Sequence, residues 1–502
     1  MARDVIVVGA GPVGLMTAGE LKLRGVDVVV LERLTAPTRQ SRGASFTRRT
    51  AECFDQRDLL GRLGATEPAD SHFGGIPIDL GMLAQDHFGH RGVSQFRTER
   101  MLEEWVGELG VPVLRGREVT GLRQDADGVV VDVEGPDGPA EEHAAHLVGC
   151  DGGRSTVRKL AGIGFPGTDG RRGFLTADVT GIDTRKRRIG EDLPGGSMVM
   201  AMDLENGVTR VVVHEAGTRP PRDRDALSFT DLADAWQRLT GESIHHGQCR
   251  WISCFTDASR AAAEYRRGRV FLAGDAAHVQ PPAMAQGLSV GVQDAVNLGW
   301  KLAAVVRGRA PEGLLDTYHA ERHPVGEQLA RNARAAIELR LTGEDMDPVR
   351  EVVGELLTHR DAAGYAAGML SNLGIRYDLA KGDHPLLGLR MPPDRTLTLA
   401  DGTRTRVAEL LRTGRGLLIT TGDTTGTPTP TAPHHDDYAD RVDTVTGTWT
   451  DTPDTTPGTT PDTALDAVLV RPDGYVAWTA PGTTDDLDQA LDRWFGPART
   501  AL

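Results

Sequence analysis

Residues 4–32 read DVIVVGAGPVGLMTAGELKLRGVDVVVLE, and this stretch decides the fold of the chain. The continuous apolar run at its start is typical of a strand that is buried on both faces. A GxGxxG pattern follows at once, then an expected helix, then a second apolar strand that ends in an acidic residue. The glycine pattern alone would be weak, but in this context it predicts a dinucleotide-binding βαβ unit.

Each position of the pattern has a physical role. Gly9 permits a tight turn, Gly11 lets the backbone approach a pyrophosphate, and Gly14 allows the helix to pack close to the strand. Glu32, at the end of the second strand, is expected to bind the hydroxyls of an adenosine ribose. The motif serves NAD and FAD equally well, and a βαβ unit that binds no nucleotide is the alternative.

A second stretch, residues 268–304, reads GRVFLAGDAAHVQPPAMAQGLSVGVQDAVNLGWKLAA. It predicts a buried strand, a turn and a helix that begins near Gln286. The first turn of a helix has unpaired backbone N–H groups and partial positive charge, which suit an electron-rich ligand atom, and Gly287 lets this backbone approach closely. Asp275 is placed to accept hydrogen bonds from sugar or ribityl hydroxyls. An ordinary strand–loop–helix unit is the alternative.

Length and composition limit the classes of protein. A chain of 502 residues with 39% hydrophobic and 25% charged residues predicts a soluble protein of two or three domains. It has no apolar run of membrane length and no signal peptide, which predicts a cytoplasmic protein. The net charge of -15 argues against nucleic acid or an anionic membrane as partner. The four cysteines form no CxxC pair, so no metal site is expected.

Three motifs follow one another over about the first 330 residues: GAGPVG with Glu32, DGGRSTVR from Asp151, and GDAAH with PPAMAQGLSVGVQDAVNLGWKL from Gly274. Together they resemble the single-component aromatic flavoprotein monooxygenases of the para-hydroxybenzoate hydroxylase fold. The resemblance implies an α/β plus α+β protein, in which an FAD-binding Rossmann-like domain is interleaved with a β-sheet substrate domain. It implies FAD as cofactor, NADPH or NADH as a transient co-substrate, and O2.

The resemblance also implies which residues contact FAD. They are Gly9, Gly11, Pro12, Gly14, Glu32, Arg33, Arg42, Gln95, Val119, Asp151, Asp275, Pro282, Gly287, Leu288 and Ser289. Arg42 belongs to the arginine-bearing loop of the family, together with Arg48 and Arg49, although solvated charges are the alternative. No catalytic residue is assigned, because His278 and His214 are candidate bases only through their proximity to the motifs.

The remaining pattern divides the chain into domains. Residues 1–172 and 266–385 are expected to form the FAD-binding domain with a helical extension, and residues 173–265 the substrate sheet, with a hairpin turn at Asn206-Gly207. The expected pocket residues are Met198, Met200, Met202, Pro281 and Met284, for which core packing is the alternative. Polyketide hydroxylases usually have Gly-Gly where this chain has Met284-Ala285, and asparagine where it has Ser289.

A helix is expected after His323-Pro324 as far as about residue 357. The sequence LVRPDGYVAW resembles the C-terminal thioredoxin-like domain of larger family members, which implies such a domain over residues 393–502. It contains no cysteine and cannot exchange disulfides, so a structural or assembly role is expected. A tract rich in threonine, proline and aspartate, residues 421–463, predicts a long loop.

The leading interpretation is an FAD-dependent, NAD(P)H-consuming monooxygenase that acts through a C4a-hydroperoxyflavin. Its expected substrate is a polycyclic aromatic polyketide of tetracycline, angucycline or anthracycline type, hydroxylated in secondary metabolism, and a homodimer is compatible with the resemblance. Baeyer-Villiger insertion into a polyketide ketone remains open. A non-catalytic flavin-binding or assembly protein is the alternative of a different class. Flavin-dependent halogenation is disfavoured because the sequence has no WxWxIP.

Overall fold

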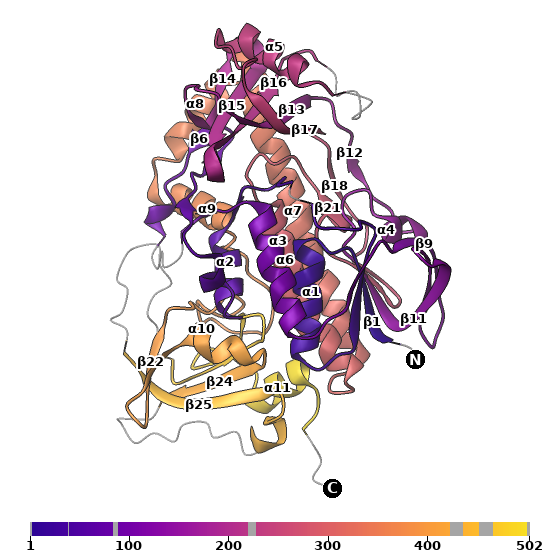
Figure 1. The fold of residues 1–502 in the computed structure, drawn as a ribbon. Helices are drawn as coiled ribbons and strands as arrows, with labels where there is room; N and C mark the ends of the chain where they lie inside the picture. The colour runs from indigo at the N-terminus through magenta and orange to yellow at the C-terminus, as the bar shows by residue number, and fades with distance from the viewer. Residues whose placement is uncertain are drawn as a thin grey trace.

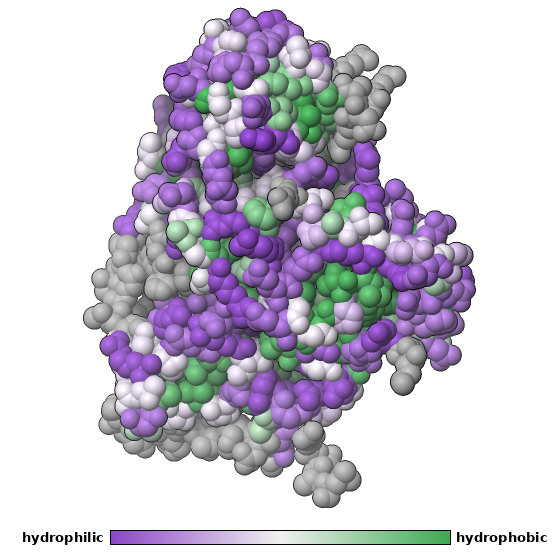
Figure 2. Space-filling model, in the orientation of Figure 1, coloured by the Kyte–Doolittle hydropathy of each residue, from purple (hydrophilic) through white to green (hydrophobic). Residues whose placement is uncertain are grey.

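The computed structural model describes residues 3–38, 40–83, 89–218, 227–421, 435–450 and 465–498. Figure 1 shows a sheet domain at the top, long helices beside a central sheet in the middle, and a C-terminal domain at the bottom. Hydrophilic residues cover most of the face drawn in Figure 2, with smaller apolar areas between them. No helix of the described chain has both the length and the apolar character needed to cross a membrane.

The central sheet has a parallel core, as the apolar runs predict. Its strand order is β19-β20-β11-β1-β2-β8, and the antiparallel pair β9–β10 continues from β11. The strands are β1 (Arg3–Val8), β2 (Val28–Glu32), β8 (Val113–Arg115), β9 (Glu118–Gln124), β10 (Val129–Gly135), β11 (Gly138–Gly149), β19 (Arg266–Arg267) and β20 (Val270–Leu272). Because β1 pairs in parallel with both β2 and β11, the predicted Rossmann-like unit is confirmed.

Three helices pack together beside this sheet (Figure 1): α1 (Pro12–Leu23), α3 (Gln95–Glu108) and α6 (Gly287–Val306). Two shorter helices, α2 (Arg48–Asp55) and α4 (Thr156–Leu160), complete the layer around the motifs. Helix α6 begins one residue after Gln286, where the spacing predicts it. Its polar residues Asp294, Asn297 and Lys301 are 0–2% exposed, so α6 is buried on its polar face as well as its apolar one.

The substrate sheet is antiparallel, in the order β14-β15-β16-β13-β17. Its strands are β13 (Gly173–Thr180), β14 (Arg187–Leu193), β15 (Ser197–Asp203), β16 (Val208–His214) and β17 (Gln248–Thr256). The hairpin predicted between β15 and β16 is confirmed, with Asn206 at φ 60°. Val199 and Ala201 face helix α5 (Phe229–Thr240), whereas Met198 and Met200 lie on the opposite face, as period-two alternation requires.

The helical pattern predicted from Pro324 to about residue 357 is confirmed at its end, where α8 (Asp347–Leu356) stops, but its start is wrong. Helix α7 runs over Asp316–Leu341 and includes Pro324, which an isolated helix would tolerate only at a cost of about 3 kcal/mol. Buried residues on both sides of the proline, among them Tyr318 and Leu329, hold the helix together through tertiary packing. The helix ends before Gly343, whose φ is 92°, and the chain continues as α8 (Asp347–Leu356) and α9 (Arg360–Ser371).

The C-terminal domain is a mixed sheet in the order β23-β22-β25-β24-β26-β27. Its elements are β22 (Thr396–Leu399), β23 (Arg404–Arg406), α10 (Val407–Leu410), β24 (Gly416–Thr421), β25 (Val442–Trp449), β26 (Ala467–Val470), β27 (Val476–Ala480) and α11 (Leu487–Phe495). The predicted loop over residues 421–463 is wrong at β25, where alternating β-branched residues form a strand despite their polar composition. Residues 422–434 and 451–463 of that tract lie outside the described chain.

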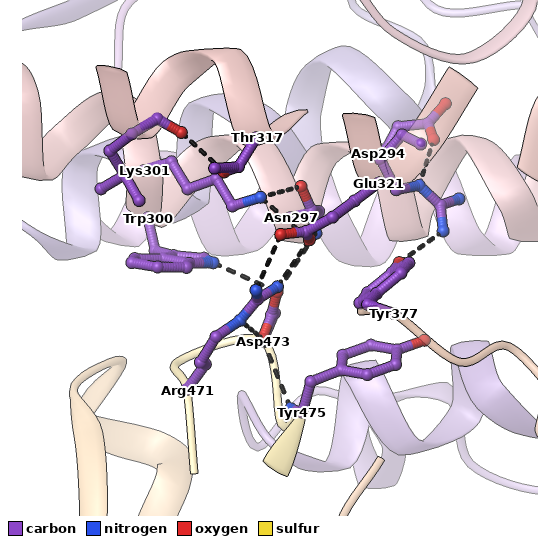
Figure 3. Close-up of polar contacts among 12 residues, drawn as sticks. Asp294, Asn297, Trp300, Lys301, Thr317, Glu321, Tyr377, Arg471, Asp473 and Tyr475 are labelled. Carbon is purple, nitrogen blue, oxygen red and sulfur yellow. Dashed lines mark hydrogen bonds and ion pairs between the residues drawn. The ribbon is translucent and has the colours of Figure 1, made fainter. Parts of the chain in front are cut away.

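A buried ionic network joins this domain to the centre of the molecule (Figure 3). The fully buried guanidinium of Arg471 contacts both carboxylate oxygens of Glu321 at 2.8 Å and also pairs with Asp473. Asn297 donates to Glu321 at 2.7 Å and to Asp473 at 3.2 Å, and Lys301 lies 2.9 Å from Glu321. The turn between β26 and β27 is therefore inserted against α6 and α7.

Burial and charge compete in this network. Burial alone would raise the pKa of the Glu321 carboxyl, but Arg471 and Lys301 outweigh it and lower the pKa to about 2. Burial lowers the pKa of Lys301 to about 8, against the opposing effect of Glu321. Each charge is acceptable in the interior only while its partners remain in place.

We expect Glu321→Gln to lower the free energy of unfolding at neutral pH by about 3–5 kcal/mol, because Arg471 and Lys301 keep their buried charges without a counter-charge. Urea unfolding measures the difference. Glu327→Gln on the exposed side of the same helix is the matched control and should change stability by less than about 0.5 kcal/mol. Equal effects of the two substitutions would contradict the role given to the network.

The native protein and the Glu321→Gln variant should also differ in how their stability depends on pH in the acidic range. The pKa of Glu321 is about 2 in the folded chain against an ordinary 4.5, so its contribution is complete above 4.5 and is lost as the pH falls toward 2. The loss amounts to roughly 3 kcal/mol in the native protein and is absent from Glu321→Gln. The urea midpoints of the native protein and of Glu321→Gln should therefore approach each other as the pH falls from 4.5 toward 2.

Candidate active site

Two helices point uncapped N-termini at the carboxyl edge of the central sheet. Gly11 precedes the first residue of α1 and Gln286 that of α6, and neither makes a side-chain cap hydrogen bond. The helices touch at their first turns, since a Cβ atom added to Gly291 would lie 2.7 Å from Val13 and 3.0 Å from the Cα of Gly274. Unpaired N–H groups and two helix dipoles are thus directed at one region, which favours an anionic or electron-rich ligand.

The three glycines of the first motif have distinct surroundings. Gly9 has φ 106°, and a Cβ there would lie 2.5 Å from the carbonyl oxygen of Cys150. A Cβ on Gly14 would lie 1.9 Å from the oxygen of Gly9, which is the close helix–strand approach that the motif predicts. A Cβ on Gly11 would meet no atom within 4 Å. Gly11 therefore borders open space, as a cradle for a pyrophosphate requires.

Glu32 is held beside this glycine turn. Its carboxylate accepts hydrogen bonds from the backbone N–H groups of Ala10 and Leu34, each at 2.8 Å. Its carbonyl oxygen accepts from the N–H of Arg117 at 2.9 Å, which brings the start of β9 and Val119 to the same edge. Arg33 follows Glu32 and is exposed.

The loop that carries Arg42 meets the starts of two helices. The N–H of Gly43 donates to Oε1 of Gln95 at 3.0 Å, and the Gln95 amide donates to Glu99 at 2.7 Å. A Cβ on Gly43 would lie 3.7 Å from Leu288 in the first turn of α6. Arg42 itself is exposed. The structure therefore brings together Arg42, Gln95 and Leu288, which are far apart in the sequence.

Asp275 lies at the end of β20 with a solvent-accessible side chain. Although accessible, its carboxyl is surrounded by protein atoms that reduce its hydration, and this raises its pKa above the ordinary value, while His278 and Arg42 act in the opposite direction. In the DGGRSTVR motif, one oxygen of Asp151 accepts from the N–H groups of Thr156 and Val157 and so caps helix α4. The other oxygen of Asp151 is buried without a hydrogen-bond partner within the described chain.

Two candidates, one in the first turn of α6 and one in the loop before it, do not point into open space. The hydroxyl of Ser289 accepts a hydrogen bond from the N–H of Thr47 at 2.9 Å, so this side chain supports the start of α2. Met284 is 7% exposed and packs in an apolar cluster with Val290 and Leu329. Pro281 is also buried, whereas Pro282 is exposed. In this loop only Pro282 and the backbone near Gly287 are accessible candidates.

The remaining candidates lie under the substrate sheet or in the core. Met198 and Met200 pack with Ile337 of α7, and Met202 is partly buried on the same strand. His214 bonds the carbonyl of Gly173 at 2.8 Å, and burial lowers its pKa. His278 is fully buried. Neither histidine is placed as a base at an open site.

Two buried acidic residues that the motif analysis did not assign hold the site in shape. Asp294 accepts from the N–H of Gly274 at 3.0 Å, contacts Nε2 of His278 at 2.8 Å, and pairs with Arg322 at 2.7 Å. Asp178, on β13, pairs with Arg210, and Arg210 also donates to the carbonyl oxygens of Ser41 and Arg42. In the sequence, Asp294 is marked only as a polar residue within an apolar helix pattern. No sequence pattern indicated a role for Arg210.

These features fit FAD. The open glycine turn suits a pyrophosphate, Glu32 suits a ribose, and Asp275 suits the ribityl hydroxyls. The N-terminus of α6 suits the pyrimidine edge of a flavin, which becomes anionic on reduction. The fold and this site define a flavoprotein.

Comparison with known proteins agrees with this class. Residues 2–333 match the FAD binding domain family, and residues 384–498 match the family described as aromatic-ring hydroxylase, C-terminal. The anhydrotetracycline monooxygenase of Streptomyces rimosus is 42% identical over 521 residues, which cover 99% of each chain. The crystal structure of CabE, an aromatic hydroxylase from angucycline biosynthesis, is 50% identical with a TM-score of 0.92, covering 99% of this chain and 100% of that one.

A dialkyldecalin synthase of Streptomyces rugosporus is also similar, at 38% identity over 508 residues that cover 99% of this chain and 100% of the relative. The present chain belongs to the FAD-dependent aromatic-ring hydroxylases, a family of flavoprotein monooxygenases.

The loop before α6 contains a strained alanine. Ala285 has φ 53°, a conformation that costs a residue other than glycine about 1–2 kcal/mol. We expect Ala285→Gly to raise the free energy of unfolding by about 0.5–1 kcal/mol, after subtraction of the greater freedom of glycine in the unfolded chain. Thermal unfolding measures it. Ala283→Gly is the control: φ is not positive at Ala283, so this substitution should lower the free energy of unfolding. A loss of stability in both variants would refute the backbone strain at Ala285.

Proposed function

We propose that this monooxygenase hydroxylates a polycyclic aromatic polyketide of tetracycline, angucycline or anthracycline type, with consumption of NAD(P)H and O2. The observation that carries the proposal is the meeting of Gly11, Glu32, Arg42 and Asp275 at the uncapped ends of α1 and α6. The choice of substrate class is supported by two relatives, an anhydrotetracycline monooxygenase and an aromatic hydroxylase from angucycline biosynthesis.

The residues proposed to hold FAD are Gly9, Gly11, Pro12, Gly14, Glu32, Arg33, Arg42, Gln95, Val119, Asp151, Asp275, Pro282, Gly287 and Leu288. For Ser289 we propose a contact through its backbone, since its hydroxyl is bonded to Thr47. When bound, FAD supplies the redox and oxygen-activating chemistry that side chains lack.

The residues of the chain would bind the flavin, orient it and shield it from water. The first turn of α6 stabilises negative charge by about 0.3–1 kcal/mol, and by more where water is excluded. Asp294 fixes the backbone before Asp275, so the acceptor for the ribityl chain is preorganised. The substrate sheet covers this region from the side of Met198, Met200 and Met202, which form an adaptable apolar surface.

Two other outcomes are distinguished by the product. Baeyer-Villiger insertion would give an ester or lactone, whereas hydroxylation leaves the carbon skeleton intact. The similarity to a dialkyldecalin synthase favours testing a second candidate, a flavin-bound cyclase that transfers no oxygen. Incorporation of labelled oxygen separates that candidate from both monooxygenase outcomes.

We further propose a thioredoxin-like fold for residues 393–502, supported by the parallel pair β24/β25 beside the antiparallel hairpin β26/β27. The bridges Gly382–Thr483 and Arg390–Tyr475 attach the preceding segment to this domain.

The exposed apolar residues Val349 and Val352 on α8 support a homodimer. The use of NADPH supports a cytoplasmic location.

The reaction is tested with the purified, FAD-loaded protein. We expect anhydrotetracycline or an angucycline to accelerate NADPH oxidation by about tenfold or more, and the product to carry one atom from isotopically labelled dioxygen. Mass spectrometry and the position of the new bond give the outcome. A yellow protein that converts the substrate without labelled oxygen would replace the monooxygenase assignment with the cyclase.

Loss of the Asp275 carboxylate should weaken FAD binding. An acceptor that forms charged hydrogen bonds is worth about 1.5–3 kcal/mol, so Asp275→Ala should raise the Kd of FAD by about ten- to hundredfold. Fluorescence titration of the flavin-free protein measures the Kd. Asp137→Ala, on the exposed β10–β11 hairpin, is the control and should leave the Kd unchanged.

A further inference from the structure

A cavity of about 950 Å³ opens between residues 68–71, 77–81 and 89–91 on one side and residues 186–190 on the other. Residues 187–190 belong to β14, the edge strand of the substrate sheet. The volume lies in the range of sites that enclose small molecules. None of the residues assigned to FAD lines this cavity.

The inner wall of the cavity adjoins the flavin site. Arg48 lines the cavity and directly follows Thr47, whose N–H donates to Ser289 in the first turn of α6. Ile78 and Leu80 line it as well, and they pack in one cluster with Met284 from the loop before α6. A ligand in the cavity is therefore separated from the start of α6 by a single layer of side chains.

The cavity also adjoins the methionine face of the sheet. Gly190 lines the cavity, and a Cβ added to it would lie 3.2 Å from the sulfur of Met198. The edge strand β14 thus separates the cavity from the methionine face of the sheet, which the sequence predicts to contact the substrate. A molecule in the cavity therefore contacts the edge of the sheet and lies next to the side chains that cover the loop before α6.

The walls combine apolar surface with positive charge. The apolar residues are Pro68, Pro77, Ile78, Leu80 and Ile189, and the cationic residues are Arg48, Arg91, Lys186, Arg187 and Arg188, against the acids Asp70 and Asp79. Two of these cations are paired with acids outside the lining, Lys186 with Asp203 and Arg187 with Glu242. Such a lining suits a flat apolar molecule that carries an anionic group.

The cations differ in their availability to a ligand. Arg187 is 8% exposed and engaged by Glu242 and Glu191. Arg188 is 61% exposed at its side chain, and its contact with Asp70 is long, at 3.9 Å. Arg188 is therefore free to turn toward an anion at the mouth of the cavity, because a weak exposed pair holds it only loosely.

We propose that this cavity is the entrance and outer binding site for the substrate, and that it selects fused aromatic rings bearing an ionised acidic group. The rings lie against the wall formed by Ile78 and Leu80, and the anion is met by Arg188, whose pairing with Asp70 is long and exposed. The inference rests on the proposed function, since it assigns the substrate of that same active site.

Binding to the full-length, FAD-loaded protein tests the charge. The probes are a dihydroxyanthraquinone carboxylic acid and its methyl ester, measured by equilibrium dialysis. Arg188→Gln should raise the Kd of the acid about three- to fivefold and leave the ester unchanged. Arg185→Gln, in the same segment but outside the cavity lining, is the matched control and should change neither Kd. Equal responses of acid and ester would overturn the selection for an anion.

A steric substitution tests the place of binding. Ala69 lines the cavity, and Ala69→Trp should weaken both probes by about tenfold or more, with Ala69→Leu giving a smaller loss in the same direction. If Ala69→Trp does not fold, Ala69→Leu still tests whether the probes bind in the cavity. Ala400→Trp, at an exposed turn of the C-terminal domain, is the control. Unchanged binding in the Ala69 variants would overturn the proposal.

Failure of this inference is distinguishable from failure of the proposed function. Oxygen transfer to a polyketide with unaltered binding in the Ala69 variants would refute the cavity alone. Binding in the cavity without any transfer of labelled oxygen would refute the proposed function and leave the cavity as a ligand site.

Discussion

The burial of Arg471 is the interaction on which the arrangement of the molecule depends. A guanidinium without contact to water is tolerated only when carboxylates surround it, and here Glu321 and Asp473 do so. Glu321 belongs to α7 of the central domain and Asp473 to a turn of the C-terminal domain. The buried guanidinium is bonded from both domains at once, and these contacts hold the two domains against each other.

Helix α6 carries that constraint to the active site. Its C-terminal half provides Asn297 and Lys301 to the ionic network, whereas its first turn provides the uncapped N–H groups at the flavin site. Between them, Asp294 holds Gly274 and so the turn that presents Asp275. The C-terminal domain contains no cysteine, and its Asp473 holds the C-terminal half of this helix through Asn297 and Trp300.

The elements that local patterns predicted well are those whose residues act on their immediate neighbours. The βαβ unit, the Asn206-Gly207 hairpin and the start of α6 follow from periodicity and turn chemistry. Strand β25 and the passage of α7 through Pro324 did not, because packing against distant segments overrides composition and intrinsic propensity.

The sequence by itself determined the class of the cofactor site, because the steric requirements at Gly9 and Gly14 and the acid at Glu32 are encoded within a few residues. Only the tertiary structure decided which candidate side chains face a ligand. Ser289 and Met284 lie in the motif, yet one bonds Thr47 and the other fills a core, since side-chain direction depends on partners far along the chain. The same reason hid Arg210, whose carbonyl partners at Ser41 and Arg42 come together with it only after folding.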